Sequence, residues 1–262
     1  MESTESSPAS RARPAHTRVE VAARTHIGPR AVNADAFVTE EAAGFYAVAD
    51  GMGDTARSCI IAQMALDAVR ELFTGSWSRS SRAERSIEEA RQRILRGVTN
   101  AHGVIYSPWV PRSRRRGTTF AGVVDCGDHV CVGHVGDSRV YLLRASRGRL
   151  ALLTRDHTVA GEACGRGASP EEAAELPDAR MLTRVIGVRT AIRVEPVVQR
   201  WEPGDIALLC TDGVSDHVAA DAITDILLDA PDLGVAADQL IDRAGQLGSS
   251  DNATVVLVHR VT

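Results

Sequence analysis

The sequence has 262 residues, which is enough for one large domain or two small ones, and 44 % of them are hydrophobic, ample for a buried core. The net charge of −4 argues against a protein that binds nucleic acid through bulk positive charge. An aromatic content of 4 % argues against surfaces that stack bases.

The five cysteines are odd in number and form no CxxC pair, so they predict small core residues in a reducing compartment and not a disulfide set. No apolar run has the length that spans a membrane, and residues 1–17 lack the apolar core of a signal peptide. Their Ser, Arg and Pro content is typical of a disordered leader. We therefore expect a cytoplasmic protein with no membrane or nucleic-acid partner, in which residues 18–262 form a single domain.

Two short strands are predicted at the start of this domain. Residues 18–25 alternate apolar and polar side chains, as a half-buried strand does, and a second strand is predicted at residues 36–39. Arg30 lies between them, after a Gly-Pro turn. Its guanidinium group suits a phosphate or a carboxylate, although a surface arginine is the simpler interpretation of that residue alone.

The next apolar run, residues 45–49, ends in Asp50-Gly51. Asp-Gly after a strand usually marks a hairpin turn, but a second strand would have to follow at once. Residues 56–73 instead have apolar side chains at helical spacing. Asp50 is therefore expected at the end of a buried strand, where the chain turns into a helix.

Residues 74–85 are rich in Ser and Arg and are predicted to be a loop, and a second amphipathic helix is predicted from Ile87. Two successive long helices are expected to pack antiparallel across one sheet face. The arginines at 114–116 suit an acidic target, although a solvated loop is the better default. Residues 117–144 have the spacing of an antiparallel meander, with Asp137 in one of its turns.

Residues 156–180 are predicted to form a small flap outside the sheets, with a helix that Ser169 caps. A further apolar run, residues 206–211, ends in Asp212-Gly213, and two helices are predicted after Ser215. Asp251-Asn252 then stands directly before a last strand that begins at Ala253.

Three strand-like segments thus carry an aspartate at one end, and Asp50, Asp212 and Asp251 can converge if the strands share one system of sheets. Clustered carboxylates repel one another unless a cation lies between them. Ligation by oxygen alone favours Mg²⁺ or Mn²⁺ over zinc or copper. Three separate structural aspartates remain open as an alternative, because Asp is common at strand ends and turns.

The order of the motifs resembles the metal-dependent protein phosphatases of the protein phosphatase 2C type, in their bacterial form. The resemblance covers nearly everything from Arg18 to the C-terminus. It rests on VADGMG at residues 48–53, GTT at 117–119, GDSRVY at 136–141, LTRDHT at 153–158, LTRVIG at 182–187, GD at 204–205, LLCTDGVSD at 208–216 and DNAT at 251–254.

The resemblance implies an α+β fold: a four-layer α/β/β/α sandwich of two antiparallel sheets flanked by helix pairs. Strands followed by helices would otherwise have suggested a parallel sheet. It also implies hydrolysis of phosphoserine and phosphothreonine in proteins, by a water that bridges two Mn²⁺ or Mg²⁺ ions. The partners would then be phosphorylated proteins, the products of a Ser/Thr kinase.

The same resemblance assigns roles by motif position. Asp50 would bridge both metal ions, the Gly51 carbonyl would ligate the second, and Asp212 and Asp251 would complete the first. Asp137 would help to hold a weaker third ion. Arg30 would bind the substrate phosphate, and Asp35 would orient the water.

Three departures from the family pattern bear on activity. Ala34 stands where many members have a carboxylate for the second metal, and Asp54 and Thr55 replace a glycine and a histidine. Met52 occupies the place of a histidine acid found in many eukaryotic members, and His157 is better explained as a structural residue. A weakly active or inactive relative that binds phosphoproteins, and a phosphatase of small metabolites, therefore remain alternatives.

Overall fold

The computed structural model describes residues 18–110 and 116–261. The predicted leader, residues 1–17, and two of the three arginines at 114–116 lie outside the described residues. None of the described helices has both the length and the apolar character that crossing a membrane would require.

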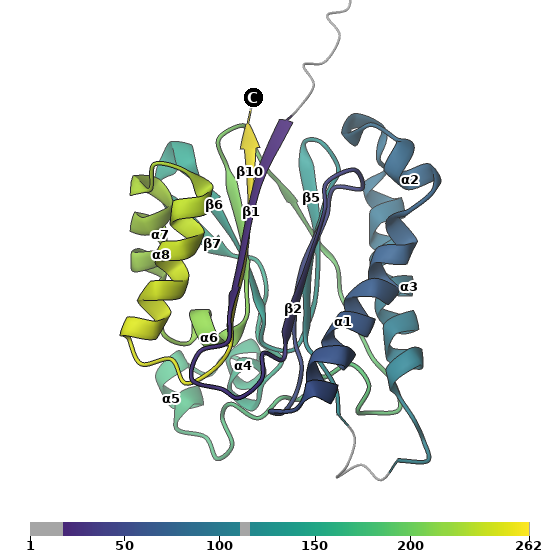
Figure 1. Ribbon diagram of the computed structural model, residues 1–262, viewed down its shortest axis with the longest axis vertical. Coiled ribbons are helices and arrows are strands. Elements are labelled where there is room, and N and C mark those ends of the chain that lie inside the picture. Colours follow the sequence, from purple (N-terminus) through teal and green to yellow (C-terminus); the bar gives the residue numbers. More distant parts are fainter. Residues whose placement is uncertain (1–17, 111–115, 262) are drawn as a thin grey trace, which may run out of the picture.

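Two five-stranded antiparallel sheets form the centre of the molecule (Figure 1). The first sheet has the order β1 (Arg18–His26), β10 (Ala253–Val261), β9 (Ile206–Cys210), β6 (Arg139–Arg144) and β7 (Arg149–Leu152). The second has the order β2 (Asp35–Glu40), β3 (Phe45–Asp50), β4 (Phe120–Asp125), β5 (His129–Val135) and β8 (Val197–Arg200). Buried residues of both sheets, among them Val48, Leu142 and Val256, pack together into one apolar cluster.

Helices cover the outer face of each sheet (Figure 1). On the second sheet, α1 (Ala56–Arg70) contacts β2 and β3, and α3 (Ile87–Ile105) contacts β5 and α1. On the first sheet lie α7 (Ala220–Asp229) and α8 (Leu233–Gln246). The predicted four-layer sandwich is therefore confirmed, and the paired helices lie where the resemblance implied.

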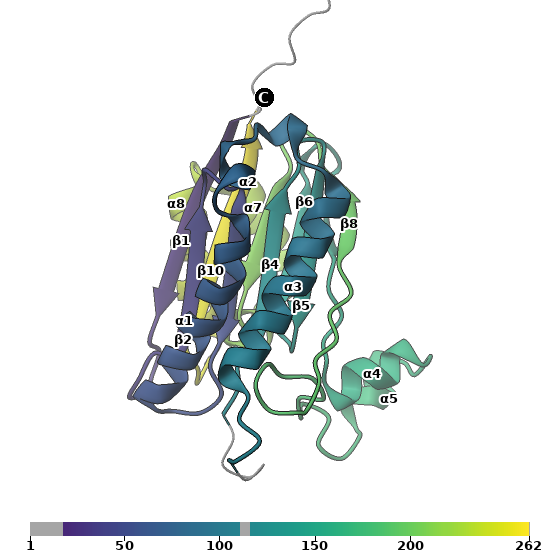
Figure 2. The same cartoon turned by 90° about the vertical axis from the view of Figure 1, so that its right-hand side faces the viewer.

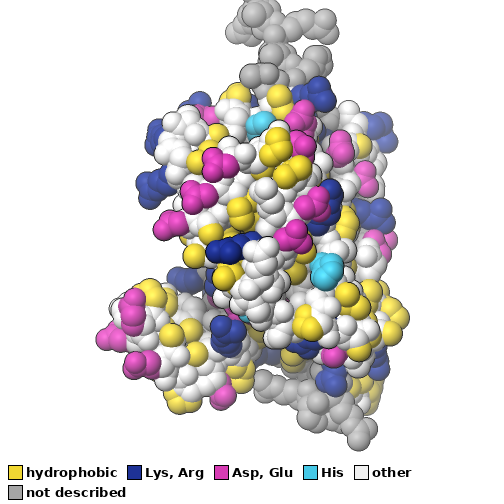
Figure 3. Space-filling model, turned by 60° about the vertical axis from the view of Figure 1, so that its left-hand side comes forward, with side chains coloured by type: hydrophobic (Ala, Val, Ile, Leu, Met, Phe, Trp, Pro, Cys, Tyr) yellow, Lys and Arg dark blue, Asp and Glu magenta, His cyan; other side chains and the backbone are white. Residues whose placement is uncertain are grey.

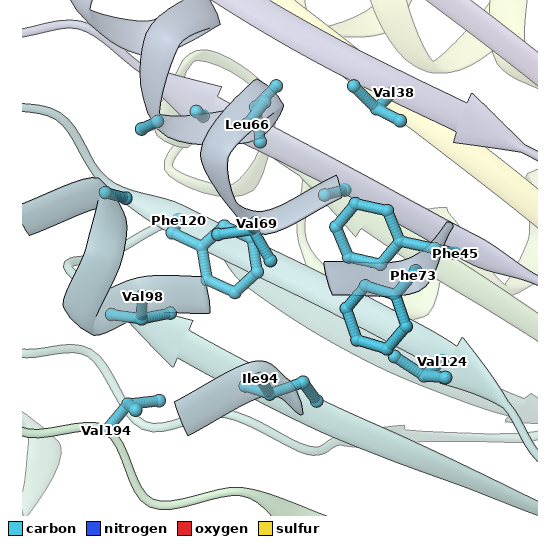
Figure 4. Packing of buried hydrophobic residues seen from close by; sticks show 14 of the residues in the cluster. Val38, Phe45, Leu66, Val69, Phe73, Ile94, Val98, Phe120, Val124 and Val194 are labelled. Carbon is cyan, nitrogen blue, oxygen red and sulfur yellow. The ribbon is translucent and has the colours of Figure 1, made fainter. Parts of the chain in front are cut away.

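Aromatic side chains anchor the second sheet to its helices (Figure 4). Phe45 of β3 stacks on Phe73, with ring centroids 4.8 Å apart. Phe73 belongs to η1 (Glu71–Phe73), a 3₁₀ turn that continues α1. Both rings are fully buried, and burying an aromatic side chain of this size stabilises the fold by about 2–3 kcal/mol.

The predicted loop at residues 74–85 is wrong in part. It contains the short helix α2 (Ser76–Arg79) and the 3₁₀ turn η2 (Arg82–Glu84). Trp77 explains the ordered turn, because its ring is buried against Phe73 and its Nε1 donates a hydrogen bond of 2.9 Å to the carbonyl oxygen of Ala43. One buried tryptophan does not produce a helical periodicity in the sequence, so the pattern of apolar residues did not predict this helix.

The predicted meander over residues 117–144 is also wrong in part. β4 and β5 pair as expected, but β6 belongs to the other sheet, where it lies between β9 and β7. Val140 and Leu142 face the cluster between the sheets, whereas Tyr141 and Leu143 face α7 and α8. The spacing of strands along the chain does not reveal such a change of sheet, which occurs in the turn that contains Gly136.

The flap projects from one end of the sandwich (Figure 2). It contains α4 (Val159–Gly165) and α5 (Pro170–Ala174), which contact each other. Ser169 caps α5 as predicted, since its Oγ accepts a hydrogen bond from the Glu172 backbone and the Glu172 carboxylate accepts one from the Ser169 backbone. The described residues also contain two short elements, η4 (Ala145–Arg147) and α6 (Asp212–Ser215).

Candidate active site

Five aspartates from both sheets come together at the end of the sandwich near α6 (Figure 1). Asp50 ends β3, Asp35 begins β2, Asp137 lies in the turn between β5 and β6, Asp212 follows β9 as the first residue of α6, and Asp251 lies just before β10. Antiparallel pairing places Asp35 directly opposite Asp50. The strand ends that the sequence singled out are therefore brought together, from two sheets and not from one.

The backbone around Asp50 is held by the GTT motif. Thr119 Oγ1 accepts a hydrogen bond of 2.8 Å from the Asp50 amide, and its own amide donates one of 2.9 Å to the Asp50 carbonyl oxygen. Thr118 Oγ1 donates to the same carbonyl oxygen at 2.8 Å. Thr119 Oγ1 also lies 2.6 Å from Ser138 Oγ, next to Asp137. These contacts fix the strand end that carries Asp50 relative to the turn that carries Asp137.

Gly51 lies where only a glycine fits. Its amide donates a hydrogen bond of 3.1 Å to the carbonyl oxygen of Ala34, and the next amide, of Met52, donates one of 2.9 Å to Gly117. A Cβ atom at position 51 would lie 2.2 Å from the carbonyl oxygen of Ser58. This close approach of three backbone segments explains the glycine and sets the direction of its carbonyl group.

Asp35 is buried, and two threonines hold it. Thr211 Oγ1 and Thr254 Oγ1 donate hydrogen bonds of 2.8 Å and 2.7 Å to its Oδ2 atom. Burial raises the pKa of Asp35 to about 7. The charges of Asp212 and Asp251 act in the same direction, whereas the two hydrogen bonds act to lower the pKa. The two threonines were missed by the sequence reasoning, although they belong to the LLCTDGVSD and DNAT motifs.

Burial and mutual repulsion raise the pKa of the other carboxyl groups. The pKa of Asp50 lies well above its usual range because of burial and of the charges of Asp35, Asp212 and Asp137. Burial and the charge of Asp212 raise the pKa of Asp137 to about 7. Burial, with the charges of Asp216 and Asp251, raises the pKa of Asp212 to about 6. Such a group of carboxylates is unfavourable unless protons or a cation compensate it.

Arg30 lies against this cluster. Its Nη2 donates a hydrogen bond of 2.6 Å to Asp251 Oδ2, and its Nε donates one to the carbonyl oxygen of Ser250. Asn252 ties the Arg30 loop to β10, because its Nδ2 donates to the carbonyl oxygens of Ile27 and Val32 and its Oδ1 accepts from the Ala34 amide. The asparagine of the DNAT motif thus helps to hold the loop that carries Arg30.

The donor set fits Mg²⁺ or Mn²⁺, since it consists of carboxylate and carbonyl oxygens. Asp137 Oδ1 is buried without a hydrogen-bond partner among the described residues, so it is available to a cation. As the side chains are oriented, no three Asp, Glu, His or Cys residues in the described ranges surround one point at ligand distance. In this arrangement Asp251 bonds to Arg30 and to the Asn252 amide, and Asp35 bonds to Thr211.

His157 has a structural role. It is buried, its Nδ1 accepts a hydrogen bond of 3.1 Å from the Gly136 amide, and its ring stacks on His134 at 4.3 Å. Burial and the nearby His134 lower its pKa to about 3. The neutral ring therefore fixes the turn before Asp137, and Nδ1 carries no proton to donate.

The two departures near the site differ in their surroundings. Ala34 is buried, with only 4 % of its surface exposed, and its backbone bonds to the Asn252 side chain and to the Gly51 amide. Asp54 is exposed in the turn before α1. Position 34 is therefore the departure that bears directly on the surroundings of Gly51.

Comparison with known proteins identifies the family. The profile of the protein phosphatase 2C family matches residues 23–236. A serine/threonine phosphatase of Listeria welshimeri is 32 % identical over 216 residues, which are 81 % of this chain and 83 % of that protein. The Mycobacterium tuberculosis serine/threonine protein phosphatase PstP is 31 % identical over 80 % of this chain and 39 % of its own length.

Solved structures agree with this match. The serine/threonine phosphatase of S. agalactiae superposes with a TM-score of 0.82 and 28 % identity, over 94 % of this chain and all of that chain. The catalytic domain of PstP in complex with two manganese ions superposes with a TM-score of 0.74 and 27 % identity, over 93 % of this chain and 99 % of that one. The chain belongs to the protein phosphatase 2C family of metal-dependent serine/threonine phosphatases, in its bacterial form.

Proposed function

We propose that this chain hydrolyses phosphoserine and phosphothreonine in proteins, with Mn²⁺ or Mg²⁺ held by the aspartate cluster. The observation that carries the proposal is the convergence of five aspartates from two sheets beside one arginine. The substrates would be proteins phosphorylated by a Ser/Thr kinase. The five cysteines are free, which supports a reducing compartment such as the cytoplasm.

The ligand roles are those that the family resemblance assigns by motif position. Asp50 would hold both ions, the Gly51 carbonyl oxygen the second, and Asp212 and Asp251 the first. Asp137, with its unpartnered buried oxygen, would help to hold a weaker third ion. Bound Mn²⁺ or Mg²⁺ would lower the pKa of the attacking water and neutralise charge on the phosphoryl oxygens.

The remaining steps belong to side chains of the protein. The Arg30 guanidinium group would anchor the phosphate through two parallel hydrogen bonds, which a planar fork makes possible. Asp35 would orient the attacking water, because the threonine hydroxyls fix one of its oxygens in place. Met52 cannot donate a proton, and His157 Nδ1 is already an acceptor, so the leaving oxygen would take its proton from water.

The test is hydrolysis of an aryl phosphate with and without Mn²⁺, by the wild-type protein and by Asp212→Asn. We expect turnover that requires the metal and falls by at least about 10²-fold in the variant, as for removal of a group that stabilises the transition state. A panel of phosphopeptides and small phosphorylated metabolites, assayed in parallel, should show preference for the peptides. No turnover by the folded wild-type protein at any Mn²⁺ concentration would contradict the proposal.

A second function is favoured by one observation, the buried Ala34 beside Gly51. If the second ion binds weakly because position 34 has no carboxylate, the protein would be a slow enzyme or a module that binds phosphoproteins without turnover. Bound metal can be counted by isothermal titration. A single tight site would favour the binding module, and two would favour the phosphatase.

A further inference from the structure

A basic pocket lies at the base of the flap, on the segment that leads from α5 back to β8. Figure 2 shows this segment as the green trace below β8. The pocket has a volume of about 300 Å³, and its lining includes Arg184, Arg189 and Arg193 together with Glu162 of α4. Guanidinium groups that line one pocket repel one another unless an anion compensates their charge.

The middle of this segment is rich in arginine. Four arginines and no Asp or Glu occur between Asp178 and Glu195. Two of the four are paired, since Arg180 lies 3.0 Å from Asp216 and Arg193 lies 2.7 Å from Glu195. The other two, Arg184 and Arg189, line the pocket.

Neither Arg184 nor Arg189 has a carboxylate within ion-pair distance in the described part of the chain. Glu162, on the pocket wall, lies 3.8 Å from Arg166 of the flap. Acidic side chains of the projecting lobe gather on its outer edge (Figure 3). The positive charge of the pocket is therefore left for a ligand from outside.

The pocket is close to the aspartate cluster but separate from it. The Thr183 amide donates a hydrogen bond to the carbonyl oxygen of His157, whose own amide donates to Gly136, the residue before Asp137. Ile186 pairs with Thr118, which holds the Asp50 carbonyl oxygen. The segment that carries the arginines is thus attached directly to both sides of the candidate active site.

We propose that this pocket binds a second anionic group of the substrate polypeptide, a carboxylate or a phosphoryl group on a residue some distance from the one that is dephosphorylated. Arginine recognises both groups through its planar fork of donors. The inference rests on the proposed function, because it assigns a substrate preference to the same active site. Arg184 and Arg189 are in this view specificity residues and not catalytic ones.

The test compares phosphothreonine peptides that differ at one flanking residue, placed in turn at several distances from the phosphothreonine. The flanking residue is Gln, Glu or an amino acid whose side chain carries a phosphonate group that cannot be hydrolysed. We expect the wild-type KM to be about tenfold lower for the Glu or phosphonate peptide at the best position, with kcat unchanged, as one or two charge-assisted hydrogen bonds would give. Preference for the phosphonate peptide over the Glu peptide would assign the pocket to doubly phosphorylated substrates. Equal preference for the two peptides would assign it to substrates with acidic residues.

The double variant Arg184→Gln/Arg189→Gln should lose this preference. Its KM for the Gln peptide and its rate on an aryl phosphate should stay at the wild-type values. The matched control is Arg147→Gln/Arg149→Gln, which removes two exposed arginines, one at the end of η4 and one at the start of β7, and should keep the preference. A wild-type protein with no preference at any position, or an equal loss on all peptides in the double variant, would overturn the proposal.

A binding measurement separates this proposal from the proposed function. The anisotropy of a fluorescent Glu-containing peptide that carries no phosphate is measured with each protein in a chelator at low ionic strength. Wild-type protein should bind it several-fold more tightly than the double variant does. Equal binding would overturn the pocket alone, whereas absence of turnover on every phosphate ester would overturn the proposed function alone.

Discussion

Arg30 Nη2 and Asp251 Oδ2 lie 2.6 Å apart, so the candidate phosphate anchor contacts a candidate metal ligand directly. The register of β1 against β10 creates this contact, because His26 pairs with Ala253 and the chain then passes beside Asp251. A Cβ atom at Gly28 would lie 2.2 Å from the Asp251 carbonyl oxygen, which shows how closely the two segments approach. The orientation of the guanidinium group therefore depends on the carboxylate cluster.

Replacing Arg30 with lysine should lower kcat/KM on an aryl phosphate by about 10- to 100-fold in the presence of Mn²⁺. Lysine keeps the positive charge but lacks the planar fork that bonds two phosphate oxygens at once. Steady-state kinetics should show the loss mainly in KM. The matched control is Arg24→Lys, since Arg24 makes a similar pair of hydrogen bonds with Asp238 at the surface. An equal loss in both variants would contradict a role in binding phosphate.

The metal-free protein should change in stability with pH through its buried aspartates. Burial and the charge of Asp212 raise the pKa of Asp137 to about 7, whereas an Asp in the unfolded chain titrates near 3.9. The folded state therefore binds more protons between about pH 4 and pH 7, so this group's contribution to the free energy of unfolding falls as pH rises through that window.

The Asp137→Asn variant lacks this contribution, so its comparison with the wild type separates the effect of Asp137 from that of other titrating groups. In a chelator, the melting temperature of the variant should equal that of the wild type near pH 4 and exceed it at pH 8, by about 5 °C. Excess Mn²⁺ should reverse the order at pH 8, because a cation favours the ionised wild-type carboxylate. Asp225→Asn, at an exposed position of α7, is the control, and a difference that does not change with pH would contradict the argument.

Position 51 should tolerate no side chain. The Cβ of Gly51→Ala would lie 2.2 Å from the Ser58 carbonyl oxygen and 2.9 Å from that of Ala34, both of which are backbone atoms. We expect a loss of about 2–3 kcal/mol in the free energy of unfolding, measured by denaturant titration. Gly103→Ala, in α3 with no neighbour within 4 Å, should instead gain about 0.5–1 kcal/mol. A stable Gly51→Ala protein would show that this close approach is not required.

Local sequence patterns pointed to part of the candidate site because three aspartates stand where an apolar run begins or ends. Asp50, Asp212 and Asp251 could be found in this way, and the family resemblance added Arg30, Asp35 and Asp137. The layered fold followed from the same resemblance and not from periodicity, which would have suggested a parallel sheet.

The parts that could not be predicted depend on contacts between distant residues. Thr211 and Thr254 bond to Asp35 across 176 and 219 residues of sequence, and the motifs that contain them do not reveal this partner. The assignment of β6 to the first sheet depends on which neighbours complete its two apolar faces, and the strand's own sequence does not contain that information. The ordered turn around Trp77 also depends on a contact with a distant residue, because the indole ring is buried against Phe73 and bonds to Ala43.

Ala34→Glu should strengthen the binding of a second ion. The Ala34 carbonyl oxygen accepts the Gly51 amide hydrogen at 3.1 Å, so a carboxylate at position 34 would stand beside the proposed ligand of that ion. Titration calorimetry should show tighter binding of the second Mn²⁺ ion by the variant than by the wild type, and the variant should need less Mn²⁺ for half-maximal turnover.

The stability of two variants at position 34 separates the effect of side-chain charge from the effect of side-chain size. Ala34 is buried, so in a chelator Ala34→Glu and the isosteric Ala34→Gln should both be less stable than the wild type, by about 1–3 kcal/mol. Mn²⁺ should restore the stability of the Glu variant alone, because only a carboxylate gains a cation as its partner. If the wild type already binds two ions tightly, or if the Gln variant is rescued equally, the departure at position 34 does not weaken the second site, and full phosphatase activity is the expected property of the wild-type chain.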